Sequence, residues 1–494
     1  MPQDVSSRRG VTRRGFLTVA VSAVVAGVVA GVGAYYAGRL AAPAEVTKEV
    51  TRTVERTTTI TAPPTTVTKT ITTTVTTTVA ATTPTPTKEN EVRIGNLASM
   101  TGQMAAFGQP AAFAIRKCVE DVNRLGGLDV GGKKLPVKLI QYDDSSDPSK
   151  ATALAEQLIL QDKVQIIIVP PGPPVVSIPV NQVAERYKIP CLSDGYVESW
   201  WGAGPWKYCW TGNLPWFVTP VPGNDFRAGK PGYRALYNFL DFTDLFRDRL
   251  NKKIALFATN DADGKTFFEL APKVAEAAGY TIVGVEKSLG LYAPGTVDFT
   301  AIIREWMKGE ADVLWGMSIG ADFATMWRQA ASLGWKPKMA MDGRALKNYD
   351  DVAAIGGDLA IGLTDPFQAW HPSLTYKSFY GGRTCASLAD EWTRETGKAW
   401  TEMLVTYGWA ETACRAIEIA GSLDPEKINQ AFPNIDFMSI AGRVKIIPEY
   451  HSSPSLFHVA QWVKTNKPWV WEAEIVWCAD PSIKPTHDIV FPLP

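Results

Sequence analysis

The chain has 494 residues, 46% hydrophobic and 20% charged, which is enough for a terminal segment and two domains with buried cores. Its 50 basic and 50 acidic residues cancel at pH 7, so the composition excludes a general attraction to nucleic acid. The 4 His and 6 Cys form no Cys-x-x-Cys or His-x-x-x-His pair, which argues against a zinc site, and no metal is expected. Cys118 and Cys414 fall on apolar helix faces and are expected to be buried free thiols, while pairing of the other cysteines stays open.

Residues 1–40 are predicted to be a targeting segment. The run 12–17 contains a paired Arg followed by Phe-Leu and is similar to a twin-arginine export signal. An uncharged, mostly apolar stretch at 15–38 would span about 36 Å as a helix, more than the ~30 Å hydrocarbon core of a bilayer. The Arg residues before it stay in the cytoplasm, so the bulk of the chain is placed outside. Ala42-Pro43-Ala44 allows cleavage, so two outcomes stay open: a retained anchor, which the length favours, and a removed signal peptide.

Residues 41–90 consist mostly of Thr with Val, Lys, Glu and Pro. This composition buries too little apolar surface to offset the conformational entropy of an ordered chain. Thr- and Pro-rich runs are typical of extended, often O-glycosylated stalks. Thr and Val alternate as in a strand, but no turn signal or partner strand is evident. We therefore expect a disordered stalk before a globular part at 91–494.

Strand and helix patterns alternate from residue 91 onward. Val92 and Ile94 begin a strand that leads into the small, polar loop 99–109. A helix with an apolar face follows and stops at Gly126-Gly127. A second strand runs from Leu135 to Leu139, before an acidic turn. This is one βαβ unit, whose loop at the carboxyl end of the first strand is where open α/β sheets bind ligands.

More units of the same kind follow along the chain. Asp147-Pro148 is a good helix start, and the apolar run 164–169 is typical of a central parallel strand. A Trp-, Gly- and Pro-rich passage at 196–246 breaks the rhythm, as a crossing between lobes would. After it, further elements are predicted: strands at 254–259, 281–286, 313–316, 338–341 and 360–364, and helices at 264–278, 298–308, 321–333, 384–396 and 402–420.

These patterns predict an α/β fold of two doubly wound lobes joined by a hinge. The first lobe is expected at about 91–212 and 345–440, and the second at 213–344 with the C-terminal part.

The globular part resembles the type I periplasmic binding proteins, specifically the branched-chain amino-acid (Leu/Ile/Val) receptors of ABC transporters. The likeness covers nearly all of 91–440, and its most specific motif is Tyr-Asp-Asp-x-x-Asp-Pro at 142–148, after a Gly-Gly-capped helix. Weaker motifs also carry it: Ile94-Gly95, Met100-Thr101-Gly102, Phe107-Gly108, Asn123 with Gly126-Gly127, Phe299 with Ile303, the strand 311–314 and the run 328–334.

The resemblance implies a Venus-flytrap protein whose lobes close on a small solute and hand it to a membrane permease, with no catalysis and no cofactor. It places ligand contacts at strand-end loops, and our candidates are Phe107, Ser177, Gly195, Tyr196, Asp263, Ser318 and Asp342. In the family, the position matching Asp342 pairs with the ammonium group of the ligand. The alternative interpretation is that Asp342 stabilises a turn or a helix start before Gly343. Phe107 either walls the ligand or packs in the core.

Three departures from the family pattern leave the solute open. The loop that commonly offers hydroxyls and N–H groups to a carboxylate is here Pro-Pro-Gly-Pro-Pro at 170–174, and its first downstream hydroxyl is Ser177. Asp263 stands where Tyr is usual, and the positions of a disulfide found in some members hold Ser146 and Pro173. An amino acid, an amide, a short peptide or a carboxylic acid therefore all fit.

Two other classes of function, a serine hydrolase and a ligand sensor, fit parts of the sequence. Gly316-Met317-Ser318-Ile319-Gly320 matches the nucleophile elbow of a serine hydrolase, with four His downstream, but it also suits a ligand-facing loop. A ligand sensor has the same fold, but about a dozen residues before the apolar segment are too few for a cytoplasmic output domain. We therefore predict an extracytoplasmic, monomeric solute-binding protein of an ABC importer, held at the membrane by its N-terminal helix.

Overall fold

The structure is a computed structural model. It describes residues 90–172, 174–194, 203–211, 234–453 and 457–494, together with the strand pairing of 52–62 and 65–75. The chain divides into two compact units, Met1–Thr87 and Lys88–Pro494.

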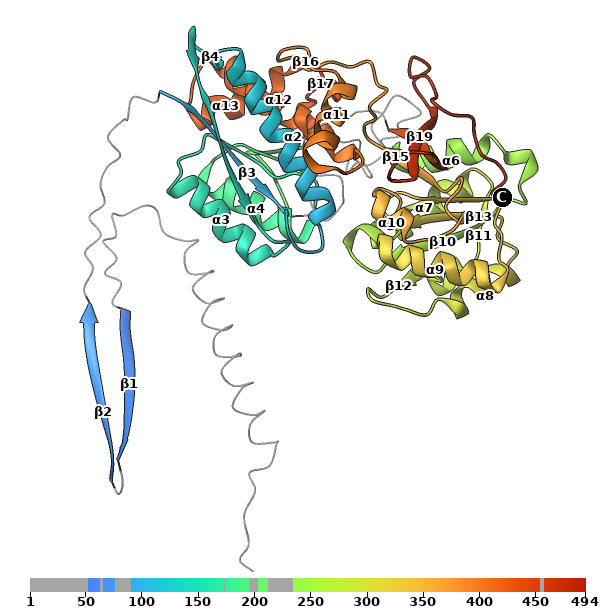
Figure 1. The fold of residues 1–494 in the computed structure, drawn as a ribbon, viewed down its shortest axis with the longest axis horizontal. Coiled ribbons are helices and arrows are strands. Elements are labelled where there is room, and N and C mark those ends of the chain that lie inside the picture. Colours follow the sequence, from blue (N-terminus) through green and yellow to red (C-terminus); the bar gives the residue numbers. More distant parts are fainter. Residues whose placement is uncertain are drawn as a thin grey trace, which may run out of the picture. The chain divides into compact units, whose positions relative to one another are not determined.

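The Thr-rich segment of the first unit contains a pair of strands. β1 (Arg52–Ala62) and β2 (Thr65–Val75) pair antiparallel, with Thr58 opposite Lys69 (Figure 1). The expectation that this segment lacks a partner strand is therefore wrong, because β-branched Thr, Val and Ile favour extended pairing even without a turn signal. The predicted targeting segment at 1–40 lies outside the described residues. No helix that the structure describes has the length and apolar character needed to cross a membrane.

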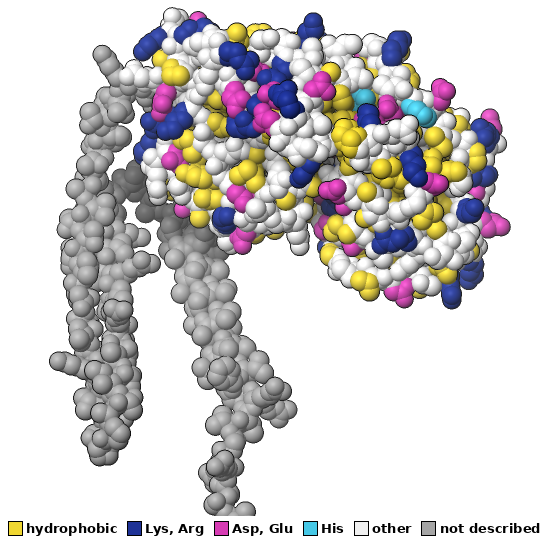
Figure 2. All heavy atoms as spheres, in the orientation of Figure 1, with side chains coloured by type: hydrophobic (Ala, Val, Ile, Leu, Met, Phe, Trp, Pro, Cys, Tyr) yellow, Lys and Arg dark blue, Asp and Glu magenta, His cyan; other side chains and the backbone are white. Residues whose placement is uncertain are grey.

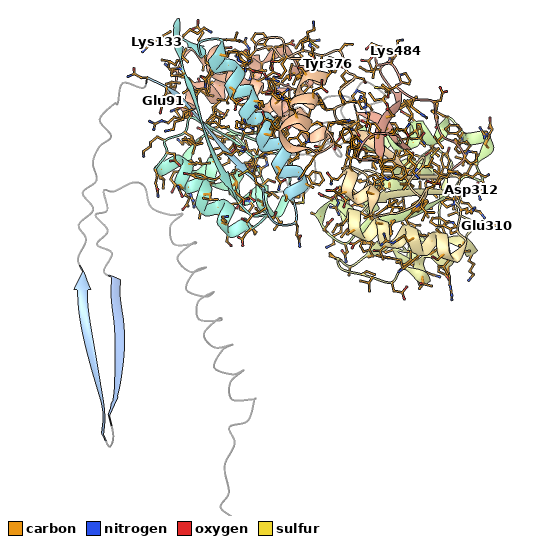
Figure 3. All side chains as sticks on the ribbon, viewed as in Figure 1. Glu91, Lys133, Glu310, Asp312, Tyr376 and Lys484 are labelled. Atoms are coloured by element: carbon orange, nitrogen blue, oxygen red, sulfur yellow. The ribbon has the colours of Figure 1, made fainter. Side chains whose placement is uncertain are left out.

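The first lobe of the second unit is built on a five-stranded parallel sheet with the order β6-β3-β7-β8-β9. Its strands are β3 (Val92–Ala98), β6 (Val137–Asp143), β7 (Ile166–Ile168), β8 (Cys191–Ser193) and β9 (Cys209–Thr211). Its connecting helices are α2 (Ala105–Arg124), α3 (Pro148–Leu160) and α4 (Pro174–Tyr187). A separate hairpin, β4 (Leu128–Val130) with β5 (Lys133–Leu135), carries Lys133 at its outer end (Figure 3).

Apolar residues cover both faces of the first sheet, as the sequence pattern predicted. Ile94 belongs to the core that includes α2, whereas Leu97, on the opposite face of the same strand, packs with α3. All of β7 is fully buried, which confirms the predicted central strand. The predicted start of α3 is also confirmed, because the Asp147 carboxylate accepts the N–H groups of Ser149 and Lys150 at 2.7 and 2.9 Å.

The second lobe is built on an eight-stranded sheet with the order β11-β10-β13-β14-β15-β18-β19, in which β12 also pairs with β10. Its parallel strands are β10 (Lys253–Thr259), β11 (Thr281–Ile282), β12 (Leu291–Tyr292), β13 (Val313–Met317), β14 (Met339–Asp342) and β15 (Thr364–Gln368). Two antiparallel strands, β18 (His458–Lys464) and β19 (Trp471–Cys478), complete it. Its helices are α6 (Arg234–Asp244), α7 (Ala262–Ala277), α8 (Thr300–Lys308), α9 (Gly320–Leu333) and α10 (Tyr349–Ala353).

Between β15 and β18 the chain contributes again to the first lobe. This passage comprises α11 (Cys385–Thr396), the 3₁₀ turn η4 (Glu402–Thr406), α12 (Tyr407–Ala420), α13 (Pro425–Ala431), β16 (Asp436–Ser439) and β17 (Gly442–Lys445). It packs on α2, where the Tyr407 hydroxyl donates to Asp121 at 2.8 Å. Because β15 pairs with β14, the return lies after residue 368, later in the chain than the expected boundary near 345.

Two predicted strands differ from the structure. The strand predicted at 281–286 ends at Ile282, because Gly284 takes a positive φ of 73° and opens a 3₁₀ turn. The strand predicted at 360–364 begins only at Thr364, after a turn with Gly362 at φ 80°. On the face shown in Figure 2, basic and acidic side chains are interspersed, in keeping with the absence of net charge.

Candidate functional site

The candidate site lies at the carboxyl ends of the parallel strands. In the second lobe these ends bring together Thr259 of β10, Tyr292 of β12, Ser318 after β13 and Asp342 of β14. Glu310 and Asp312, which precede β13, lie at the other edge of this sheet (Figure 3). The polar side chains predicted as ligand contacts therefore gather at the edge where open α/β sheets bind ligands.

Asp342 is fully buried and holds the turn that follows β14. Its Oδ2 accepts the hydroxyl of Ser318 at 2.6 Å and the Ser318 N–H at 3.1 Å. Its Oδ1 accepts the N–H groups of Arg344 and Ala345 at 2.9 and 2.7 Å. Burial raises the pKa of Asp342, and these hydrogen bonds oppose that rise. Both oxygens are thus occupied within the lobe, as the turn interpretation of this residue predicts.

Arg344 connects three groups of the second lobe. Its Nε donates to the Ser318 carbonyl at 3.1 Å, Nη1 to Asp263 at 3.1 Å and Nη2 to Asp261 at 2.9 Å. Burial lowers the pKa of Arg344, but the carboxylates of Asp263 and Asp261 outweigh it and raise the pKa. These three hydrogen bonds use three of the five N–H groups of the guanidinium, one on each nitrogen, and all three go to acceptors of the second lobe.

Asp263 lies in the first turn of α7 and is 6% exposed. Its Oδ2 pairs with Arg344, whereas its buried Oδ1 accepts no hydrogen bond from the part of the chain that the structure describes. Burial raises its pKa, the Arg344 charge lowers it, and the Asp261 charge raises it further. Asp263 therefore retains an unused acceptor beside a cation that is shared with another acid.

The first lobe contributes Asp194, which follows β8 and is 3% exposed. Its Oδ2 accepts the Gly172 N–H at 3.1 Å, and its buried Oδ1 has no hydrogen-bond partner among the described residues. Burial raises the pKa of Asp194 well above its usual range. Ser177, on α4, lies close enough to Asp194 to lower the pKa of that carboxyl. The buried Oγ of Ser177 nevertheless forms no hydrogen bond with any described residue. The proline loop at 170–174 thus presents one N–H and a nearby hydroxyl to an acid.

The acids of the two lobes act on each other. Repulsion from Asp263 contributes to the raised pKa of Asp194. Since Asp194 belongs to the first lobe and Asp263 to the second, the two sets of strand ends approach closely enough for their charges to interact.

In each lobe a glycine lets one helix, α2 or α7, start close to the strand that precedes it. A Cβ on Gly108 would lie 2.1 Å from the Ser99 carbonyl, and one on Gly264 would lie 1.9 Å from the Thr259 carbonyl. This close approach fixes Phe107 and Asp263, the residues just before the two glycines, at the strand ends. Phe107 is half-buried.

Of the seven predicted contacts, the structure brings Asp263, Ser318 and Asp342 together in the second lobe and places Ser177 beside Asp194 in the first. Gly195 and Tyr196 lie outside the described residues. Sequence reasoning missed Asp194 and Arg344. The signal available was position in the sequence: Asp194 directly precedes the candidate Gly195, and Arg344 lies two residues after the candidate Asp342.

Among the described residues, Ser318 lacks the histidine partner that a serine hydrolase requires. Its hydroxyl donates to a carboxylate, Asp342, instead of to an imidazole. The four His bond elsewhere: His371 to Ser373 and the Ala473 carbonyl, His451 to the Cys209 carbonyl, His458 to the Gln368 carbonyl and His487 to the Asp488 carbonyl. The Gly-x-Ser-x-Gly run here forms a strand-end turn.

Two α/β lobes that turn polar strand ends toward each other define a bilobal solute-binding class of protein. A family profile described as periplasmic binding protein matches residues 91–467, and the chain belongs to that family. The predicted resemblance to Leu/Ile/Val receptors is thereby confirmed.

Several relatives and solved structures are similar to this chain. Leu/Ile/Val-binding protein homolog 8 of Brucella abortus is 24% identical over 359 residues, which cover 70% of this chain and 81% of that protein. The fold is similar to a leucine-binding protein of Thermotoga maritima, with a TM-score of 0.60 at 18% identity, covering 79% and 99% of the two chains. It is also similar to a solute-binding protein of R. palustris in complex with 4-hydroxybenzoate, with a TM-score of 0.59 at 19% identity, covering 81% and 98%.

Proposed function

We propose that this protein is the extracytoplasmic solute-binding subunit of an ABC importer, which captures a small organic solute between its lobes and delivers it to permease subunits. The observation that carries the proposal is that each lobe places a buried acid at its strand ends, Asp194 and Asp263, with one oxygen that no described residue hydrogen-bonds, and that the two charges interact. A solute that binds both lobes favours their closed arrangement in proportion to its differential affinity for that arrangement. Catalysis and a cofactor are not part of this function.

The solute we propose first is an amino acid of the branched-chain type or a similar one. The named ligands of the Leu/Ile/Val-binding relatives support it. A carboxylic acid is the second candidate, because a protein of similar fold was crystallised with 4-hydroxybenzoate. An amide or a short peptide also suits the proline-filled loop at 170–174.

A thermal-unfolding screen of the full chain against amino acids, amides, short peptides and aromatic acids tests this function. A solute at 100 times its Kd should stabilise the protein by about 2.7 kcal/mol, which appears as a raised Tm. If no solute in the screen raises the Tm, the proposal fails. Hydrolysis of simple esters by the wild type that is lost in Ser318→Ala would instead establish the hydrolase alternative.

We also propose that the chain acts as a monomer held at the outer face of the membrane through its first 40 residues. Sedimentation of membranes from expressing cells, with and without high salt, checks the anchoring, and N-terminal sequencing of the recovered protein shows whether the segment is retained. A free, shortened protein would support the removed signal peptide.

A further inference from the structure

The candidate site has more negative than positive charge. Three carboxylates there are linked by ion pairs or by their effect on one another's pKa: Asp194, Asp261 and Asp263. Arg344 forms ion pairs with Asp261 and Asp263, and its charge also lowers the pKa of Asp322. Asp194 has no ion-pair partner among the described residues.

Among the described residues, three polar atoms on nearly fully buried side chains at this site lack hydrogen-bond partners. They are Oδ1 of Asp194, Oδ1 of Asp263 and Oγ of Ser177, on side chains that are 3%, 6% and 1% exposed. A buried acceptor left unpaired costs about 1–3 kcal/mol, and more where it carries charge. Two of the three atoms are carboxylate oxygens, and an ionised carboxylate accepts hydrogen bonds but cannot donate them. A bound group with N–H donors and a positive charge would therefore stabilise these oxygens.

Asp194 and Asp263 belong to different lobes, so the free-energy cost of burying their carboxylates side by side arises when the lobes approach each other. Bringing Asp194 and Asp263 into one buried space costs desolvation and mutual repulsion. A cation held between them reduces both costs, because its charge offsets part of the negative charge of the pair and its N–H groups can donate to the two free oxygens. An anion would add a further negative charge, and Arg344 has already committed donors to Asp261, Asp263 and the Ser318 carbonyl.

We propose that the solute presents an organic cation, an ammonium, amidinium or guanidinium group, between Asp194 and Asp263, and that this group drives closure. The inference rests on the proposed solute-binding function and narrows its solute class. The inference assigns cation binding to Asp194 and Asp263, one acid from each lobe, in place of Asp342. The oxygens of Asp342 already accept hydrogen bonds from Ser318, Arg344 and Ala345. Ser177 lies beside Asp194 as an additional polar contact.

Matched pairs of probes test the sign of the charge. Thermal unfolding of the full chain is measured with 3-methylbutylamine, benzamidine and agmatine, and with 4-methylpentanoate and benzoate. The first and fourth probes correspond to leucine without its carboxylate and leucine without its amine. The proposal expects a rise in Tm with one or more of the cations and none with the anions.

Variants then locate the cation. Asp194→Asn and Asp263→Asn keep side-chain size and remove one charge, and each should weaken binding of the effective cation about thirtyfold or more. Asp358→Asn is the matched control, because Asp358 is exposed and pairs with Lys464 on the surface, and it should bind the cation like wild type. Unfolding of each variant without ligand shows whether it is folded, and Ser177→Ala, expected to weaken binding less, replaces any acid variant that is not.

The outcomes separate this inference from the function on which it rests. Stabilisation by the anions alone, by neutral solutes alone, or by cations equally in wild type and both Asn variants overturns the cation site and leaves solute binding standing. Stabilisation by Ca²⁺ but by none of the organic cations overturns it as well, in favour of a metal. Failure of every compound in this series and in the broader screen rejects both proposals.

Discussion

At the scale of single residues, hydrogen-bond capacity decides which acids are available to a solute. Asp342 ends a strand, Asp194 directly follows one, and both are buried. Asp342 accepts from three neighbouring backbone N–H groups and a hydroxyl, whereas the described residues give Asp194 one N–H donor, that of Gly172. The sequence alone could not separate them, because an Asp at a strand end serves a turn or a ligand with the same residue type. The separation depends on where neighbouring N–H groups point.

Asp342→Ala is expected to destabilise the protein by about 3 kcal/mol, because the buried Ser318, Arg344 and Ala345 groups lose their acceptor. Chemical denaturation measures the change. Asp358→Ala, at an exposed ion pair with Lys464, should leave stability unchanged. A wild-type-like Asp342→Ala variant that has lost solute binding would return Asp342 to the ligand role.

Glu411 predicts a pH dependence of stability. It is buried on α12, where burial raises its pKa to about 7 even though the hydroxyls of Ser378 and Ser439 and the N–H groups of Phe379 and Ile440 oppose the rise. The folded state therefore keeps a proton that the unfolded state has already released, so stability falls as pH rises from about 4.5 to about 7.

The unfolding free energy of wild type minus that of Glu411→Gln should fall by about 3 kcal/mol between about pH 5 and pH 8. Urea titrations of both proteins at four pH values in this range measure the difference. A difference that is constant over the range would show that Glu411 stays ionised in the folded protein.

At the scale of elements, a buried ion triplet connects the lobes. Lys347, after β14, lies 2.9 Å from Asp365 of β15 and 3.0 Å from Glu402 of η4, and all three side chains are almost fully buried. Burial and the Glu402 charge raise the pKa of Asp365 to about 7, although Lys347 opposes the rise. Since η4 packs in the first lobe and β15 pairs in the second sheet, this triplet sits at a crossover between them.

Lys347→Met should cost about 3–5 kcal/mol, because it leaves two carboxylates buried without their cation. Lys253→Met is the matched control, since Lys253 pairs with Glu310 at the surface, and little change is expected there. Equal stabilities of the two variants in guanidinium unfolding would mean that the triplet contributes nothing to holding the lobes.

The sequence predicted the elements that carry strong periodicity or clear caps, and it predicted little of what depends on contacts between distant segments. β3, α2, α3, β7 and α9 were found within a few residues of their expected bounds, because apolar spacing and residues such as Asp147 act locally. β12 and the start of β15 were missed, because a two-residue strand and a Gly362 turn leave no periodic signal. Lys347, Asp365 and Glu402 lie far apart in sequence, so no pattern could join them.

At the scale of the whole molecule, the account describes a second unit of two α/β lobes whose strand ends carry complementary parts of one site. The chain passes between the lobes more than once, so several segments connect them. Membership in the periplasmic binding protein family accounts for this architecture. We propose that the charges of Asp194, Asp263 and Arg344 determine which solute this site accepts.

The most direct measurement is isothermal titration of the full chain with the solute that raises its Tm most, followed by recovery of the solute and its analysis by NMR. The account predicts a single saturable site, a negative heat-capacity change from burial of apolar surface between the lobes, and a solute recovered chemically unchanged. A solute that returns converted to product, or heat that does not saturate, would contradict the claim that this protein binds and releases a small solute without transforming it.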